Sequence, residues 1–139
     1  DLAIQVVRDG EGASKFITVE VGGASSPAAA RTAGLAVANS PLVKTAIAGE
    51  DANWGRVIMA VGKSGVRLDP SKLSVAIGGV TIAENGERVR HYDESLLIDH
   101  LHGTEILIKV DLGIGRSKGR VWTCDLTHDY IRINADYRT

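Results

Sequence analysis

Apolar and polar residues alternate along residues 15–21, where Ile17, Val19 and Val21 share one face. A repeat of two residues is typical of a strand with one buried face. Five later segments have the length and the β-branched content of strands, and they cover residues 73–77, 80–83, 105–112, 119–126 and 130–135. A glycine pair between the segments 73–77 and 80–83 predicts a hairpin turn there.

A capping residue marks the first predicted helix. A serine pair followed by Pro27 predicts a helix start, because serine accepts a backbone hydrogen bond and proline has no N–H to satisfy in the first turn. The helix over residues 28–38 is so rich in alanine, with Gly34 among them, that we expect it to pack closely against another backbone. A short helix over residues 41–48 follows it.

Two amphipathic helices come later in the chain. Residues 54–61 place apolar side chains three and four positions apart, which is the spacing of one helix face. Either Asp51 or Asn53 is expected to cap this helix. Residues 93–102 predict a shorter helix that buries the leucines at positions 96, 97 and 101 and ends at Gly103.

Together these elements predict one α+β domain over residues 1–139. Strands and helices alternate irregularly, and the hairpin signals imply a mixed or antiparallel sheet covered by helices in two layers. The apolar residues within 1–7 have the pattern of the last turns of a buried helix.

Composition narrows the class of protein further. A chain of 139 residues has the size of one domain, and 44% hydrophobic with 24% charged residues excludes a disordered tail. The net charge of −1 and the lack of a basic block argue against nucleic acid or an anionic membrane as a partner. The single cysteine, Cys124, excludes an internal disulfide and indicates a reducing, cytoplasmic location.

The glycine-rich sequence GIGRSKG, residues 113–119, invites comparison with a phosphate-binding loop. A phosphate loop follows a strand and opens a helix, so that its amide groups converge on the anion. Here a second predicted strand follows instead. The context therefore favours a hairpin turn that joins the segments 105–112 and 119–126.

Nucleophile and metal chemistry have little support in the pattern. Cys124 and His128 are four residues apart, about 13 Å along a strand, whereas proton transfer needs about 3 Å. A bend would be required, so a buried structural cysteine is favoured. His100 and His102 are two apart on a predicted helix and face different sides, and no further ligand with familiar spacing surrounds them. No metal site is predicted.

Three polar features remain. Glu11 lies between two glycines on a loop that a ligand could approach closely, although a solvated turn explains it as well. The stretch EDANWGR, residues 50–56, is explained by a helix cap with Trp54 in the core. Residues 134–139 gather polar side chains at the chain end, where most residues are frayed.

Three long, ungapped segments together closely resemble the ornithine acetyltransferase family, whose members are also called bifunctional glutamate N-acetyltransferases. They are VVRDGEGASKF at 6–16, NSPLVKTAIAGEDANWGR at 39–56 and VWTCDLTHDYIRINADYRT at 121–139. The resemblance runs from the first residue to the last. The family usually reads DPNWGR and GEGATK where this chain has Ala52 and Ser14, and both departures are conservative in size.

The resemblance implies a precursor that cuts itself before an internal threonine into an α chain and a β chain. The new N-terminal threonine takes acetyl from N-acetylornithine and passes it to glutamate, and some members also accept acetyl-CoA; no cofactor is expected. This chain, which starts at Asp1 and has Met59 as its only methionine, resembles the C-terminal part of the β chain. Residues 1–22 are then expected to pack on the missing catalytic portion.

The expected partners follow from the same resemblance. They are the α chain and the N-terminal part of the β chain of the same precursor, in an α2β2 assembly. We expect the nucleophile to lie upstream of this chain and no catalytic residue within it, so the chain alone should be inactive.

Three matched positions contact the substrate in the family, namely Glu11, Asn134 and Thr139. A carboxylate can pair with the ammonium group of N-acetylornithine, and an amide and a hydroxyl each donate and accept, which suits substrates of opposite side-chain charge. Two alternatives stay open. One is a self-processing aminopeptidase-like hydrolase, in which water replaces glutamate, and the other is a non-catalytic ligand-binding or assembly domain.

Overall fold

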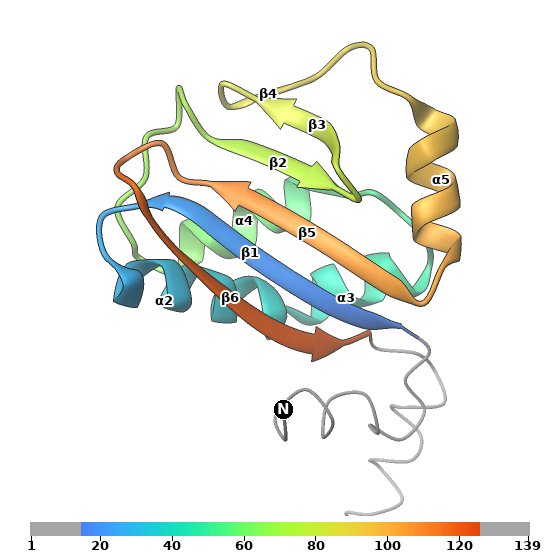
Figure 1. Ribbon diagram of the computed structural model, residues 1–139, viewed down its shortest axis with the longest axis horizontal. Coiled ribbons are helices and arrows are strands. Elements are labelled where there is room, and N and C mark those ends of the chain that lie inside the picture. Colours follow the sequence, from blue (N-terminus) through green and yellow to red (C-terminus); the bar gives the residue numbers. More distant parts are fainter. Residues whose placement is uncertain (1–14, 126–139) are drawn as a thin grey trace, which may run out of the picture.

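A computed structural model describes residues 15–125 of the chain, which form one mixed sheet with helices packed on it (Figure 1). The strands are β1 (Phe16–Ala24), β2 (Ser74–Ile77), β3 (Val80–Glu84), β4 (Glu87–Arg88), β5 (Glu105–Asp111) and β6 (Ser117–Cys124). The helices are α2 (Pro27–Ala38), α3 (Pro41–Ala48), α4 (Trp54–Lys63) and α5 (Glu94–His102). The predicted α+β class with a mixed sheet covered by helices is confirmed.

The order of strands across the sheet is β4-β3-β2-β5-β1-β6. All neighbours are antiparallel except β1 and β5, which run parallel with Ile17 opposite Ile106. Helices α2, α3 and α4 lie together on one face of the sheet, and α5 lies beside its end (Figure 1). The alternation predicted for residues 15–21 is confirmed, because Ile17, Val19 and Val21 are buried against the helices.

The hairpin predicted at residues 113–119 is wrong, because β1 lies between β5 and β6. The connection passes over the end of β1, where the Gly23 carbonyl accepts hydrogen bonds from the N–H groups of Ile114 and Gly115, each at 2.8 Å. The alternation of apolar and polar residues along a strand shows which face of the strand is buried, but it does not show which strand lies beside it. Two successive strands with a glycine-rich turn therefore have the sequence pattern of a hairpin without being paired.

Helix starts agree with the predicted caps. Ser26 accepts from the N–H of Ala29 at the start of α2, and Asn53, not Asp51, accepts from the N–H of Arg56 at the start of α4. The side chain of Leu96 in α5 is 59% exposed, so the expectation that it is buried is wrong. Leu97 and Leu101 are the buried residues of that helix.

Close packing of α2 on the sheet is a result of small residues on both sides. A Cβ added at Gly119 of β6 would lie 3.3 Å from the Cβ of Ala30 and 3.4 Å from the N of Arg31. A Cβ added at Gly34 would meet the side chain of Val121 at 3.2 Å. The expected backbone contact is thus made at Ala30 and Arg31, whereas Gly34 accommodates a valine side chain.

The segments 1–7 and 130–135 lie outside the described residues, so the helix and the strand predicted there stay predictions. The same holds for packing of residues 1–22 on a further portion; of these, residues 16–22 belong to β1. Among residues 15–125, no helix is long and apolar enough to span a membrane.

Candidate functional site

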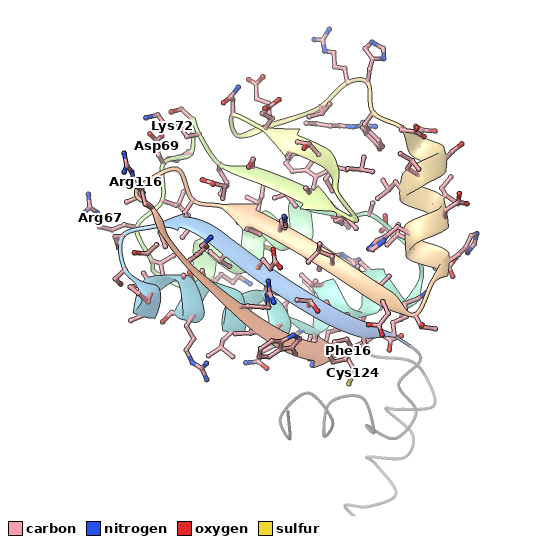
Figure 2. The ribbon with its side chains drawn as sticks, viewed as in Figure 1. Phe16, Arg67, Asp69, Lys72, Arg116 and Cys124 are labelled. Carbon is pink, nitrogen blue, oxygen red and sulfur yellow. The ribbon has the colours of Figure 1, made fainter. Side chains whose placement is uncertain are left out.

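The predicted substrate residues Glu11, Asn134 and Thr139 lie outside the described part of the chain. The described residues nearest to them in sequence are Lys15, directly before β1, and Asp125, directly after β6. These two lie at one corner of the sheet, because β1 and β6 are antiparallel neighbours with Phe16 opposite Cys124 (Figure 2).

Lys15 and Asp125 clasp this corner through two hydrogen bonds. The N–H of Lys15 donates to Oδ1 of Asp125 at 2.9 Å, and the N–H of Asp125 donates to the carbonyl of Lys15 at 3.2 Å. Asp125 is 0% exposed and Lys15 is 8% exposed. A buried carboxylate is stable only with hydrogen-bond partners. The backbone N–H of Lys15 is one such partner of Asp125.

The ammonium group of Lys15 binds the end of α5. Its Nζ donates to the carbonyls of Leu101 at 2.6 Å and Gly103 at 2.8 Å. These carbonyls lie at the C-terminus of a helix, where the peptide dipoles favour a positive charge. Oε1 of Glu50 lies 3.5 Å from the same Nζ and supplies the opposite charge.

Glu50 links this lysine to a second residue of α5. Its Oε2 contacts Nδ1 of His102, and its backbone has φ 57°, a left-handed conformation that few non-glycine residues adopt. Glu50 thus precedes the cap of α4 at Asn53. It lies in the turn between α3 and α4 and holds that turn against the end of α5.

The two histidines of α5 have separate structural roles. Nε2 of His100 accepts the N–H of Leu107 at 3.0 Å, while His102 contacts Glu50. Burial lowers the pKa of His100, and the nearby charge of Lys15 lowers it further. A neutral imidazole is what an accepting Nε2 requires. Within residues 15–125, no group of three or more His, Cys, Asp or Glu side chains could hold a metal ion.

Cys124 ends β6 at the same corner and is half-buried. Burial raises the pKa of its thiol most, while the charge of Lys44 lowers this pKa and that of Asp125 raises it. The thiol is therefore protonated near neutral pH, whereas a nucleophile requires the thiolate. Its candidate base, His128, lies outside the described residues, so that pairing stays untested.

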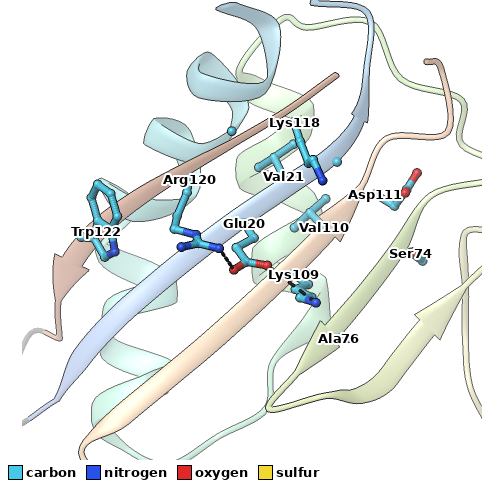
Figure 3. A pocket seen from close by; sticks show the side chains of 12 residues that line it. Glu20, Val21, Ser74, Ala76, Lys109, Val110, Asp111, Lys118, Arg120 and Trp122 are labelled. Atoms are coloured by element: carbon cyan, nitrogen blue, oxygen red, sulfur yellow. Dashed lines mark ion pairs between the residues drawn. The ribbon is translucent and has the colours of Figure 1, made fainter. Parts of the chain in front are cut away.

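A shallow hollow of about 700 Å³ lies on the sheet face that α2, α3 and α4 leave open (Figure 3). Glu20 of β1 lies at its centre, with Arg120 Nη2 2.8 Å from Oε1 and Lys109 Nζ 3.6 Å from Oε2. The register places both cations directly opposite Glu20 on the neighbouring strands. Opposite charges on facing positions stabilise a sheet, so these side chains have a structural role that needs no ligand.

A second hollow of about 430 Å³ lies between the turn after α3 and helix α5. Its lining combines the acidic groups of Glu50 and Asp51 with the aromatic rings of Trp54 and Tyr92. Trp54 is only partly buried, although it packs against the core as its sequence context predicted.

Sequence reasoning missed Lys15, Asp125 and Glu50 as structural contacts. Lys15 falls within the alternating run 15–21 that predicts a strand, and Asp125 falls within the strand predicted over residues 119–126. The available signal was a charged residue at the end of each of two apolar strands. That signal alone cannot show that the two ends meet.

Comparison with known proteins gives a consistent result over the whole chain. The model of the ArgJ family matches residues 1–139. The arginine biosynthesis bifunctional proteins ArgJ of Zymomonas mobilis and of Gluconobacter oxydans are each 60% identical to this chain over 139 residues, which is all of the chain. The crystal structure of the protein of that name from Bacillus halodurans is similar in fold, with a TM-score of 0.92 and 44% identity over 99% of this chain.

The chain is shorter than these similar proteins. It spans 34% of the length of the Zymomonas protein and 33% of the Gluconobacter protein. It covers 64% of the matched chain in the Bacillus crystal structure.

Proposed function

The chain belongs to the ArgJ family, and from this membership we propose that it is part of an acetyltransferase that moves acetyl from N-acetylornithine to glutamate. The observation that carries the proposal is 60% identity over every residue of the chain to proteins named as bifunctional enzymes of arginine biosynthesis.

The proposed reaction has two balanced half-reactions on a threonine outside this chain. The threonine hydroxyl attacks the acetyl carbonyl of N-acetylornithine, the amide C–N bond breaks, and ornithine leaves with the hydroxyl proton on its amine. The amine of glutamate then attacks the acetyl-threonine ester, and the C–O bond breaks as the proton returns to the threonine. A free N-terminal amine is a suitable base for a threonine nucleophile, which is the advantage of self-cleavage at that residue.

In this proposal the chain supplies pocket residues and no nucleophile. Glu11 pairs with the ammonium group of ornithine, and Asn134 and Thr139 bind polar groups of either amino acid. The rest of the enzyme comes from the α chain and the N-terminal part of the β chain in an α2β2 assembly, in the cytoplasm. The chain spans about a third of the length of these relatives, which supports the proposal that further portions take part. The proposed chemistry requires no cofactor, and the assay below includes acetyl-CoA because some members of the family accept it as an acetyl donor.

The test is an acetyl-transfer assay on the complete protein with N-acetylornithine and isotope-labelled glutamate, with and without acetyl-CoA. Labelled N-acetylglutamate with equal release of ornithine is expected. Free acetate instead of N-acetylglutamate would indicate the hydrolase alternative. Absence of both products, together with a protein that carries no α chain by mass spectrometry, would indicate a binding or assembly domain.

A substitution in this chain tests its part in the reaction. Glu11→Gln keeps the shape of the side chain but removes a charge-assisted hydrogen bond of about 1.5–3 kcal/mol, so kcat/KM for N-acetylornithine should fall roughly 10- to 100-fold. Glu84→Gln, the same change at an exposed position at the end of β3, is the control and should leave it unchanged. Self-cleavage should be normal in both. Wild-type kinetics in a folded, processed Glu11→Gln enzyme would remove Glu11 from the pocket.

A further inference from the structure

We propose that helix α5 docks into a groove on a second copy of this chain. The part of α5 that docks is a strip formed by Asp93, Leu96 and Asp99, which we call the acidic strip. The groove lies between α2, α3 and α4 and is called the basic groove. The contact joins two αβ units, so the inference rests on the assembly part of the proposed function.

The helices divide into two groups by charge. Helices α2, α3 and α4 together contain four lysine or arginine residues and no aspartate or glutamate. Helix α5 contains Glu94 and Asp99, is capped by Asp93, and has no lysine or arginine. Both groups expose large apolar side chains, which among residues 15–125 are Leu35, Leu42, Met59, Leu96 and Ile98. Exposed apolar groups surrounded by charge of one sign are typical of a surface that binds a partner of the opposite sign.

The basic groove is a hollow of about 240 Å³. Its lining includes Ala36 of α2, Leu42 of α3, and Arg56, Met59, Ala60 and Lys63 of α4. The four residues of α4 have the spacing of one helix face, with a cation at each end and apolar side chains between them. Leu42 and Met59 are about half exposed. A cavity of about 150 Å³ holds a benzene ring, so the groove has room for a leucine side chain.

The acidic strip has an apolar centre between two carboxylates. Leu96 is 59% exposed, more than any other large apolar side chain of the described residues. Asp93 and Asp99 lie three residues before and after it, and positions three apart are neighbours on a helix surface. Ile98 is also exposed but lies about 160° around the helix axis from Leu96, because successive residues are about 100° apart.

The strip and the groove match in spacing. Arg56 and Lys63 are seven residues apart, about 10.5 Å along α4, and Asp93 and Asp99 are six residues apart, about 9 Å along α5. None of these four side chains forms an ion pair within residues 15–125. Leu96 can therefore enter the groove while a carboxylate on each side of it reaches a cation.

The charged groups keep positions available for this contact. Arg56 donates from Nη1 to the carbonyl of Leu42 at 2.9 Å, which holds its guanidinium beside the groove and leaves further N–H donors. Asp93 uses Oδ1 to cap α5 through the N–H of Leu96 at 3.0 Å and retains its second oxygen.

A second copy is the occupant because every copy carries both surfaces. Within one chain the two surfaces are exposed and do not cover each other, since α5 lies beside the end of the sheet and the other helices lie on its face (Figure 1). A two-fold axis lets each α5 enter the groove of the other copy. The contact is then formed twice and the assembly closes, whereas an unreciprocated contact would build an open row of copies.

The test is Leu96→Lys in the complete, processed protein, because it places a cation against a groove that is already basic. The dissociation constant between αβ units, measured by analytical ultracentrifugation on dilution, should rise about 100-fold or more, since each of two contacts weakens about tenfold. Ile98→Lys is the matched control on another side of the same helix and should change this constant by less than about threefold. Unchanged association of the Leu96→Lys protein would overturn the proposal.

A charge exchange tests the pairing and decides the matter if Leu96→Lys fails to fold. Asp99→Lys should raise the dissociation constant about tenfold or more, because it places like charges together. On this background either Arg56→Glu or Lys63→Glu should restore association, according to which cation faces position 99. Glutamate at position 56 suits the first turn of α4, where a negative charge is favourable. Restoration by neither variant would overturn the proposal.

The remaining outcomes separate this contact from the proposed function. Release of the α chain by Leu96→Lys, with the contact between αβ units unchanged, would overturn the proposal, because another portion of the precursor then covers α5. Normal acetyl transfer by a wild-type protein that remains a single αβ unit would overturn the contact and leave the proposed function intact. A wild-type protein without acetyl transfer, whose association is weakened by Leu96→Lys and not by Ile98→Lys, would support the contact while the proposed function fails.

Discussion

Gly23→Ala is the substitution that most directly tests how the chain passes from β5 to β6. Gly23 has φ 62° and lies where the pairing of β1 with β6 is interrupted between Val21 and Ala24. A Cβ at this position would lie 2.2 Å from Oδ1 of Asp111 and 2.8 Å from the N of Gly113. The Asp111 oxygen in turn accepts the N–H of Gly113 at 2.9 Å.

The expected loss of stability has two parts. A left-handed conformation costs an alanine about 1–2 kcal/mol. Displacement of Asp111 breaks its exposed hydrogen bond to Gly113, which contributes about 0.5–1.5 kcal/mol. Gly23→Ala should therefore lower the free energy of unfolding by about 1.5–3.5 kcal/mol.

Gly79→Ala provides the matched control. Gly79 has φ 80° in the turn between β2 and β3, and a Cβ there would meet no atom within 4 Å. This variant should lose only the conformational part, about 1–2 kcal/mol. Urea unfolding followed by circular dichroism gives both values, and the excess at Gly23 measures the contact. Equal losses in the two variants would refute the packing of the Gly113 turn over the end of β1.

The remaining predictions concern a thiol, a histidine and the chain end. Cys124→Ser should leave acetyl transfer within a few-fold, because burial keeps the thiol protonated; abolished turnover in a folded, processed enzyme would restore a catalytic role. The pKa of His100 is lowered on folding, so the unfolded chain binds a proton more readily and stability should fall as the pH is lowered through about 6.5. His100→Gln, with an acceptor for the N–H of Leu107, should reduce that slope in unfolding measurements across pH; an unchanged slope would contradict the assignment to His100. Deletion of Arg138 and Thr139 should lower kcat/KM for N-acetylornithine at least tenfold, the effect of losing about 1.4 kcal/mol of positioning, with self-cleavage intact; wild-type kinetics would make the tail ordinary surface.

Local patterns were sufficient to predict most elements of the fold. The alternation in residues 15–21 identified β1, and Ser26 with Pro27 identified the start of α2. The glycine pair at 78–79 identified the turn between β2 and β3, where both glycines have positive φ. These features depend on which side of an element is buried and on hydrogen bonds within three or four residues, and both are visible along the chain.

Strand order was not visible in this way. β5 and β6 follow one another with a glycine-rich connection, yet β1 lies between them. The apolar alternation of β6 would be the same beside β5 or beside β1. Its place was decided by long-range packing, including the fit of Gly119 against Ala30 of α2.

For the site, the sequence supplied the candidates, and the tertiary structure decided which charged residues meet at the corner formed by β1 and β6. Glu11, Asn134 and Thr139 were reached through family resemblance and stay predictions. Lys15 and Asp125 are 110 residues apart in the chain, and each alone is an unremarkable charged residue beside a strand. Only the insertion of β1 between β5 and β6 brings the backbone N of Lys15 within 2.9 Å of Oδ1 of Asp125. A contact between residues so far apart depends on the packing of the whole sheet, and it therefore leaves no periodic pattern in the sequence.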